Sequence, residues 1–227
     1  MTLGIAFDLD DTLYLERDYV KSGFRAVAAH VAAGDRALEE RAFGILWQDF
    51  VQGVRGRAFN RLLAALPELE GRCSITELVA CYREHTPAIT FLPGVEAALC
   101  ELRARGARLA VISDGPLVSQ AAKAAALGVA RYADPVILTD AWGQRYWKPH
   151  ARAFEAVAEA FALPPERLVY VGDNPEKDFH APARLGWRSV RLRLPEQVRH
   201  HLPHEAVPPT FEVTSVAALR EQLLALL

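Results

Sequence analysis

The stretch GIAFDLDDTLY, residues 4–14, decides the fold that the chain is expected to adopt. A short apolar run ends there in three carboxylates, those of Asp8, Asp10 and Asp11. Such a run predicts a buried strand, and ligands bind beyond the carboxyl ends of strands in open parallel sheets. In an extended backbone Asp8 and Asp10 point to the same side, whereas Leu9 points toward the core.

Two carboxylates so close together repel each other unless a cation, or a proton on one of them, relieves the charge. The same residues also have a structural interpretation, because Asp11 or Thr12 could cap a following helix. Taken alone, the motif leaves capping and catalysis equally open.

Outward from this motif, apolar segments of strand type alternate with segments of helical spacing. The predicted strands are residues 3–9, 107–112, 135–138, 168–171, 189–192 and 211–213, and the helices between and after them are 95–105, 117–127, 151–161, 177–185 and 216–227. This alternation predicts an α/β fold, a doubly wound parallel sheet covered by helices on both faces.

Residues 16–90 interrupt the alternation, because they have little strand signal and carry apolar residues at helical spacings. We expect a helical insertion there, with Pro93 and Gly94 in the returning segment. The predicted domains are therefore a core of residues 1–15 and 91–227 and an inserted subdomain of residues 16–90.

Composition is that of a globular protein with a sizeable core: 227 residues, 51% of them hydrophobic and 24% charged. A net charge of −2 favours neither nucleic acid nor an anionic membrane as a partner. The three cysteines form no CxxC pair, no basic and apolar leader is visible, and no apolar run approaches the roughly 18 residues of a membrane helix. We expect a cytoplasmic protein, either a monomer or a homodimer.

Further polar residues follow the other predicted strands. Ser113, Asp114 and Gly115 follow the second strand, where a hydroxyl and free backbone NH groups suit a phosphate oxygen, although the same residues also make an ordinary turn. Lys148 precedes a helix in an aromatic context, and most lysines in such positions are simply solvated.

Another acidic loop follows the strand at residues 168–171 and contains Asp173 and Asp178. Carboxylates from two strand ends, together with a hydroxyl and a lysine from two other junctions, can converge on one point. Together they predict a Mg²⁺ site that faces a phosphate cradle.

In their order, these motifs closely resemble those of the haloacid dehalogenase superfamily, whose members are mostly phosphatases. The resemblance rests on Asp8-Leu9-Asp10-Asp11-Thr12, Ser113, Lys148-Pro149 and Gly172-Asp173 with Asp178. It implies a Rossmann-like core with the nucleophile strand in the middle. It also implies that the insertion is a helical cap of the kind that follows the first motif.

The resemblance further implies a role for each motif. Asp8 would be the nucleophile that forms an aspartyl phosphate, and Asp10 the general acid and base, so that Asp8 is ionised and Asp10 protonated when substrate is bound. The remaining implied roles are phosphoryl binding by Ser113, Asp114, Gly115 and Lys148, and Mg²⁺ binding by Asp8, the backbone carbonyl of Asp10 and Asp173, with Asp178 in support.

The chain is thus expected to be a Mg²⁺-dependent phosphatase of a small phosphorylated metabolite. Asp10 disfavours dehalogenation, because a departing halide needs no proton. A phosphomutase acting on a phosphosugar, or a regulatory or binding protein with the same fold, stays open as an alternative. The sequence departs from the superfamily pattern at Asp114, where Asn is commoner and which adds negative charge near the phosphate, and at His150, where an acidic residue is usual.

Overall fold

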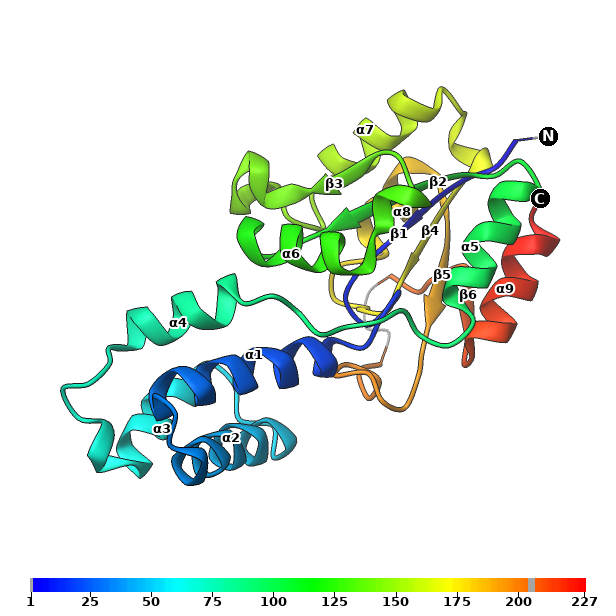
Figure 1. Ribbon diagram of the computed structural model, residues 1–227. Coiled ribbons are helices and arrows are strands. Elements are labelled where there is room, and N and C mark those ends of the chain that lie inside the picture. The colour runs from blue at the N-terminus through cyan, green and yellow to red at the C-terminus, as the bar shows by residue number, and fades with distance from the viewer. Residues whose placement is uncertain (1, 204–206) are drawn as a thin grey trace. The chain divides into compact units, whose positions relative to one another are not determined.

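A computed structural model describes residues 2–203 and 207–227, and its centre is a six-stranded sheet in which every pairing is parallel (Figure 1). The strands are β1 (Gly4–Phe7), β2 (Arg108–Ser113), β3 (Val136–Leu138), β4 (Leu168–Gly172), β5 (Arg188–Leu192) and β6 (Phe211–Val213). Their order is β3-β2-β1-β4-β5-β6, so the strand that precedes Asp8 lies inside the sheet, as predicted.

The register of β1 brings three strand ends to one edge of the sheet. Phe7 pairs with Val111 of β2 on one side and with Val171 of β4 on the other. The chain builds the sheet from β1 toward β3 and then resumes on the opposite side of β1 with β4, so the strand order reverses at β1. Ligands of doubly wound sheets bind at such a reversal.

Helices cover the sheet on both sides, and the apolar side chains of the strands are accordingly buried on both faces. They are α5 (Val95–Ala104), α6 (Leu117–Leu127), α7 (Arg152–Phe161), α8 (His180–Leu185) and α9 (Val216–Ala225). One core cluster joins Ala6, Ala110 and Tyr170 of the strands to Phe154 and Phe161 of α7. Helices α5 and α9 pack against each other on the other side of the sheet (Figure 1).

One helix is shorter than its sequence pattern suggests. The pattern predicts a helix from residue 177, but α8 begins at His180. Asn174 and Asp178 explain the later start: the backbone NH of Asp178 donates to the carbonyl of Asn174 (3.0 Å), and the Asp178 carboxylate accepts from the backbone NH of Asn174 (2.9 Å). These bonds hold residues 174–178 as a turn rather than as the first turn of a helix.

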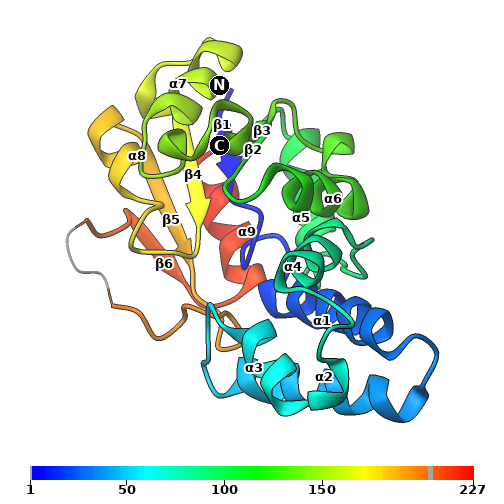
Figure 2. The ribbon, with the colours of Figure 1, turned by 90° about the vertical axis from the view of Figure 1, so that its left-hand side faces the viewer.

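The chain divides into two compact units: one contains the residues up to Arg17 and from Ile89 onward, and the other contains Asp18–Ala88. The second unit consists of most of α1 (Glu16–Ala32), with α2 (Arg36–Val51), α3 (Ala58–Ala65) and α4 (Ile75–Glu84), which Figure 2 shows from a second side. Its helices enclose a separate apolar core that includes Phe24, Leu46 and Leu62. Among the described residues, no helix is both long enough and apolar enough to cross a membrane.

Candidate active site

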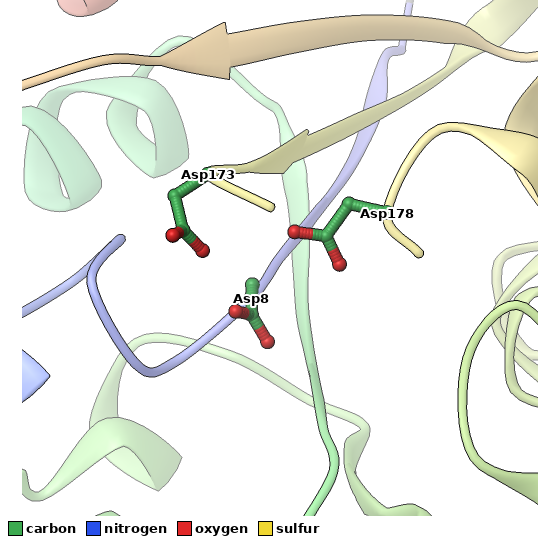
Figure 3. Close-up of side chains that lie close together, drawn as sticks. All are labelled: Asp8, Asp173 and Asp178. Atoms are coloured by element: carbon green, nitrogen blue, oxygen red, sulfur yellow. The ribbon is translucent and has the colours of Figure 1, made fainter. Parts of the chain in front are cut away.

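Three buried carboxylates meet at the edge of the sheet where β1 and β4 end. Asp8 follows β1 directly, and its backbone NH donates to the carbonyl of Val171 (2.8 Å). Asp173 follows β4, and Asp178 lies in the turn beyond it. One carboxylate oxygen from each of these three aspartates lies within 4.8 Å of the others, and Figure 3 shows the three side chains around a common space.

Lys148 reaches the same place from the segment before α7, and its side chain is fully buried. Its Nζ lies 2.6 Å from Oδ1 of Asp8, 2.8 Å from Oδ1 of Asp178 and 2.7 Å from the hydroxyl oxygen of Tyr170. An ammonium group has three N–H donors. Each donor therefore has an acceptor, and Tyr170 is a third partner that the motifs did not indicate.

The crowding of charge shifts the ionisation of these groups. Burial raises the pKa of Asp8 to about 6, although the charge of Lys148 opposes the effect. Burial and the neighbouring Asp178 raise the pKa of Asp173 well above its usual range. For Asp178 burial acts in the same direction, but the charges of Lys148 and Lys177, together with the hydrogen bonds from Lys148 and from the backbone of Asn174, outweigh it and the pKa is lowered. For Lys148 the charges of Asp178 and Asp8 outweigh burial, so its pKa is raised well above the usual range.

These features fit a divalent cation. Lys148 pairs with Asp8 and Asp178, and the buried Asp173 brings a third carboxylate to the site, so carboxylates outnumber the lysine. Oδ2 of Asp173 is buried without any hydrogen-bond partner among the residues that the structure describes. Buried charges are normally paired or bound to a metal, and carboxylate oxygens are the ligands that Mg²⁺ prefers.

The turn after β2 has the form expected of a phosphate cradle. Ser113 is fully buried, and within the described parts of the chain its Oγ has no hydrogen-bond partner. Gly115 has a φ of +131°, which side-chain-bearing residues rarely adopt. Helix α6 begins two residues later at Leu117, so the backbone turns sharply between strand and helix.

Asp114 has a different environment from the one expected of it. Its carboxylate accepts from the hydroxyl of Thr139 (2.7 Å) and from the backbone NH of Lys148 (3.2 Å), and it pairs with Nζ of Lys177 (3.2 Å). The added negative charge at this position is therefore paired with Lys177. At the same time, Asp114 ties the turn after β2 to the segment that carries Lys148.

The carboxylate of Asp10 belongs to a separate set of contacts. Oδ1 accepts from Nζ of Lys123 (2.7 Å) and from the hydroxyl of Tyr14, and Oδ2 accepts from Nε2 of Gln120 (3.0 Å). Burial alone would raise the pKa of Asp10, but the charge of Lys123 and the hydrogen bonds from Lys123, Tyr14 and Gln120 together outweigh burial, and the pKa is lowered. The order of the two pKa values, with Asp8 above Asp10, is thus opposite to the order that the sequence predicts for the substrate-bound state.

Lys123 and Gln120 lay outside the motifs, although the sequence carries a signal for them. Both lie on α6, three residues apart, and residues with this spacing share one face of a helix. Because α6 starts immediately after the Ser113 turn, that face points back toward the residues that follow β1. The signal in the sequence is a glutamine and a lysine three residues apart in an otherwise Ala-rich helix. In the structure both side chains are buried.

Asp11 has the capping role that the sequence left open. Its Oδ1 accepts from the backbone NH of Glu16, the first residue of α1 (2.7 Å), and its Oδ2 accepts from the backbone NH of Val198 (2.8 Å). Its φ of +52° lies in the left-handed region, which Asp tolerates better than most residues do. Among the three aspartates after β1, Asp11 therefore binds backbone NH groups, whereas Asp8 and Asp10 contact the side chains of Lys148 and Lys123.

Comparison with known proteins identifies the family of the chain. Residues 2–186 match the family profile of the haloacid dehalogenase-like hydrolases. A glyceraldehyde 3-phosphate phosphatase of Methanocaldococcus jannaschii is 32% identical over 85% of this chain and 85% of its own. A phosphoglycolate phosphatase of Escherichia coli is 28% identical over 83% of this chain and 80% of its own.

A solved structure shows the same fold at low sequence identity. A haloacid dehalogenase-type hydrolase of Bacillus subtilis, determined with bound magnesium, is 18% identical and superimposes with a TM-score of 0.67 over 98% of each chain. The profile match covers most of the present chain and includes all four predicted motifs. The chain therefore belongs to the haloacid dehalogenase-like hydrolase family.

Proposed function

We propose that the chain is a magnesium-dependent phosphatase that hydrolyses a small phosphorylated metabolite through a phosphoaspartate on Asp8. The observation that carries the proposal is the position of Asp8 at the end of β1, where Lys148 contacts its Oδ1 at 2.6 Å and Asp173 and Asp178 stand beside it. Phosphatase activity among relatives that cover more than four-fifths of the chain supports the same chemistry.

In the first half of the reaction, a carboxylate oxygen of Asp8 attacks phosphorus. The bond between phosphorus and the leaving oxygen breaks, and the leaving oxygen takes a proton from Asp10. Lys148 and Ser113 hold the phosphoryl oxygens, where the charge of a loose transition state is spread. Because all three donors of Lys148 already have acceptors, it must exchange one of them for a phosphoryl oxygen.

In the second half, water attacks the phosphorus of the phosphoaspartate and gives a proton to Asp10. The bond between phosphorus and the Asp8 oxygen breaks, so phosphate is released and the Asp8 carboxylate is restored. The residues that would hold the metal are Asp8 and Asp173, with the backbone carbonyl of Asp10 and with Asp178 in support. Bound there, Mg²⁺ neutralises charge as an anionic nucleophile approaches an anionic phosphate.

The relatives, rather than the pockets of this chain, support a proposal for the substrate class. The two relatives are phosphatases of glyceraldehyde 3-phosphate and phosphoglycolate, which are three-carbon and two-carbon phosphate esters. We accordingly propose a short phosphorylated carbonyl or carboxylate compound as the substrate. The helical unit of residues 18–88 is proposed as the cap that selects it.

The test is phosphate release from glyceraldehyde 3-phosphate, phosphoglycolate and p-nitrophenyl phosphate, with Mg²⁺ and with EDTA. We expect turnover that EDTA abolishes, and Asp8→Asn to lower kcat by at least about 1,000-fold while the circular dichroism spectrum stays unchanged. Isomerised product without free phosphate would point instead to a phosphomutase. Silence from folded wild-type protein on all three compounds would contradict the phosphatase and favour a binding role.

A further inference from the structure

Asp10 is the proposed proton donor, yet none of the four motifs explains how its carboxyl group is oriented. A carboxyl group can carry its proton on either oxygen, and only the oxygen that faces the leaving group is useful. The contacts of Asp10 differ between its two oxygens. Oδ1 accepts from two groups, the Lys123 ammonium and the Tyr14 hydroxyl, whereas among the residues that the structure describes Oδ2 accepts from the Gln120 amide alone.

The two donors to Oδ1 are firmly placed. Tyr14 is fully buried, and Lys123 is 5% exposed. Lys123 lies on α6, whose first turn follows the phosphate cradle, so a single helix links the cradle to Asp10. An oxygen that accepts a charged hydrogen bond and a neutral one is a poor place for a proton. These contacts therefore favour Oδ2 as the protonated oxygen.

Gln120 connects the same helix to the cradle itself. Its Nε2 donates to Oδ2 of Asp10 (3.0 Å) and to the backbone carbonyl of Asp114 (2.5 Å). A Cβ at Gly115 would lie 2.5 Å from Nε2 of Gln120, so a glycine is needed at this turn to admit the amide. The amide thus marks the side of Asp10 that faces the end of β2, where Ser113 lies.

We propose that Lys123 is a positioning residue for Asp10: by holding Oδ1, it leaves Oδ2 as the oxygen that delivers the proton to the leaving group. This inference rests on the proposed phosphatase function. Lys123 itself contacts no reacting atom in this scheme. Its removal should therefore impair proton delivery without impairing phosphoryl binding.

Leaving groups separate these two effects. An alkyl phosphate such as glyceraldehyde 3-phosphate expels a basic oxygen that needs the proton, whereas p-nitrophenyl phosphate expels a stable phenolate that needs it far less. The ratio kcat/KM reports the first half of the reaction, in which the leaving group departs. We expect Lys123→Met to lower kcat/KM about 10- to 100-fold for glyceraldehyde 3-phosphate and less than about 3-fold for p-nitrophenyl phosphate.

Two further variants complete the experiment. Asp10→Asn should show the same selectivity with a larger loss, and adding Lys123→Met to it should cost nothing more, because residues that act as a unit are not additive. Gln120→Leu keeps both contacts to Oδ1 and should lower kcat/KM for the alkyl phosphate less than Lys123→Met does. Lys123→Arg keeps the charge and should recover part of the alkyl phosphate activity if Lys123→Met proves unstable.

Equal losses of kcat/KM for both substrates in Lys123→Met and Lys123→Arg would overturn the inference, and so would unchanged or increased activity on the alkyl phosphate. In either case wild-type turnover would leave the phosphatase itself standing. Wild-type protein that hydrolyses neither compound would overturn the proposed function and this inference together.

Discussion

Tyr170 shows how one hydroxyl group can organise a charged site. It lies on β4 within an apolar strand, accepts a hydrogen bond from Nζ of Lys148 (2.7 Å) and donates one to Asp178 (3.4 Å). Its ring packs edge-on against Phe154, with centroids 4.9 Å apart. The ring therefore belongs to the apolar core and the hydroxyl to the buried ion network.

Tyr170→Phe should lower the free energy of unfolding by about 1 to 3 kcal/mol, because it leaves a buried ammonium donor without its acceptor while preserving the ring. Urea denaturation measures this loss. The matched control is Tyr132→Phe, whose more exposed hydroxyl contacts Glu96 and whose loss should change stability by less than about 0.5 kcal/mol. Equal effects of the two substitutions would show that burial of the Lys148 network does not control the cost.

At the scale of single residues, the order of the motifs predicts which aspartates and which lysine come together. It does not predict the side chains that contact them. Asp8, Lys148, Asp173 and Asp178 follow strand ends or precede a helix, so topology alone brings them together. Tyr170 stands in an apolar strand, where its hydroxyl has no periodic signature. The low pKa of Asp10 depends on Lys123, which is distant in sequence, so the spacing of Asp8 and Asp10 could not predict it.

The element that carries most of the site is β4 with the turn that follows it. Gly172 ends the strand, and Asp178 folds back over it. A Cβ at Gly172 would lie 2.5 Å from Oδ2 of Asp178 and 2.8 Å from its Cγ. Asp178 is fully buried and bonded to Lys148 and to the backbone NH of Asn174, so it has little room to move aside.

Gly172→Ala should therefore displace the Asp178 carboxylate and with it Lys148. We expect kcat for phosphate release to fall by about 100-fold, the effect of misplacing groups by about 1 Å, and stability to fall by about 1 to 3 kcal/mol through overpacking. Gly44→Ala is the control: Gly44 lies within α2, and apart from its chain neighbours and the backbone of its own helix no atom of the described residues lies within 4 Å of the added Cβ. That change should raise stability by about 0.5 to 1 kcal/mol and leave kcat unchanged. A fully active Gly172→Ala protein would contradict the tight packing.

In the helical unit of residues 18–88, the sequence pattern likewise predicts the helices but not the contacts of their charged side chains. Helical spacing predicts that this unit is helical, and local caps fix where two of its helices begin: Asp35 caps α2, and the Ser74–Glu77 capping box starts α4. Spacing does not predict the partners of its basic residues. Arg25 pairs with Glu40 (2.7 Å) and Arg61 pairs with Asp49 (2.6 Å), so both contribute to contacts within the unit.

At the scale of the whole molecule, the segment after β5 meets the loop that follows β1. The family profile ends at residue 186, yet the segment after β5 contacts the first motif directly. The backbone NH of Val198 donates to Asp11 (2.8 Å), and Arg199 pairs with Glu16 (2.9 Å). Nothing in the composition of that segment predicts these contacts, because they depend on folding that joins residues nearly two hundred positions apart.

Gln197 is the centre of this contact. Its side chain is buried, with Nε2 donating to the backbone carbonyls of Asp11 (2.5 Å) and Leu192 (3.0 Å), while Oε1 accepts from the backbone NH of Leu194 (2.7 Å). One amide thus satisfies three backbone groups from two distant parts of the chain. Its loss would leave those groups without partners and release the loop that carries Asp10 and Asp11.

Gln197→Ala should lower the free energy of unfolding by at least about 2 kcal/mol, since each buried backbone group left unpaired costs about 1 to 3 kcal/mol. It should also lower kcat for phosphate release, because the residues after β1 lose the support that fixes them. Urea denaturation and steady-state kinetics on the same preparation measure both effects, with the exposed neighbour Glu196→Ala expected to change stability by less than about 0.5 kcal/mol. A stable but inactive Gln197→Ala protein would mean that the hydrogen bonds of Gln197 serve catalysis alone. A destabilised protein with unchanged kcat would mean that the loop after β1 keeps its geometry without it.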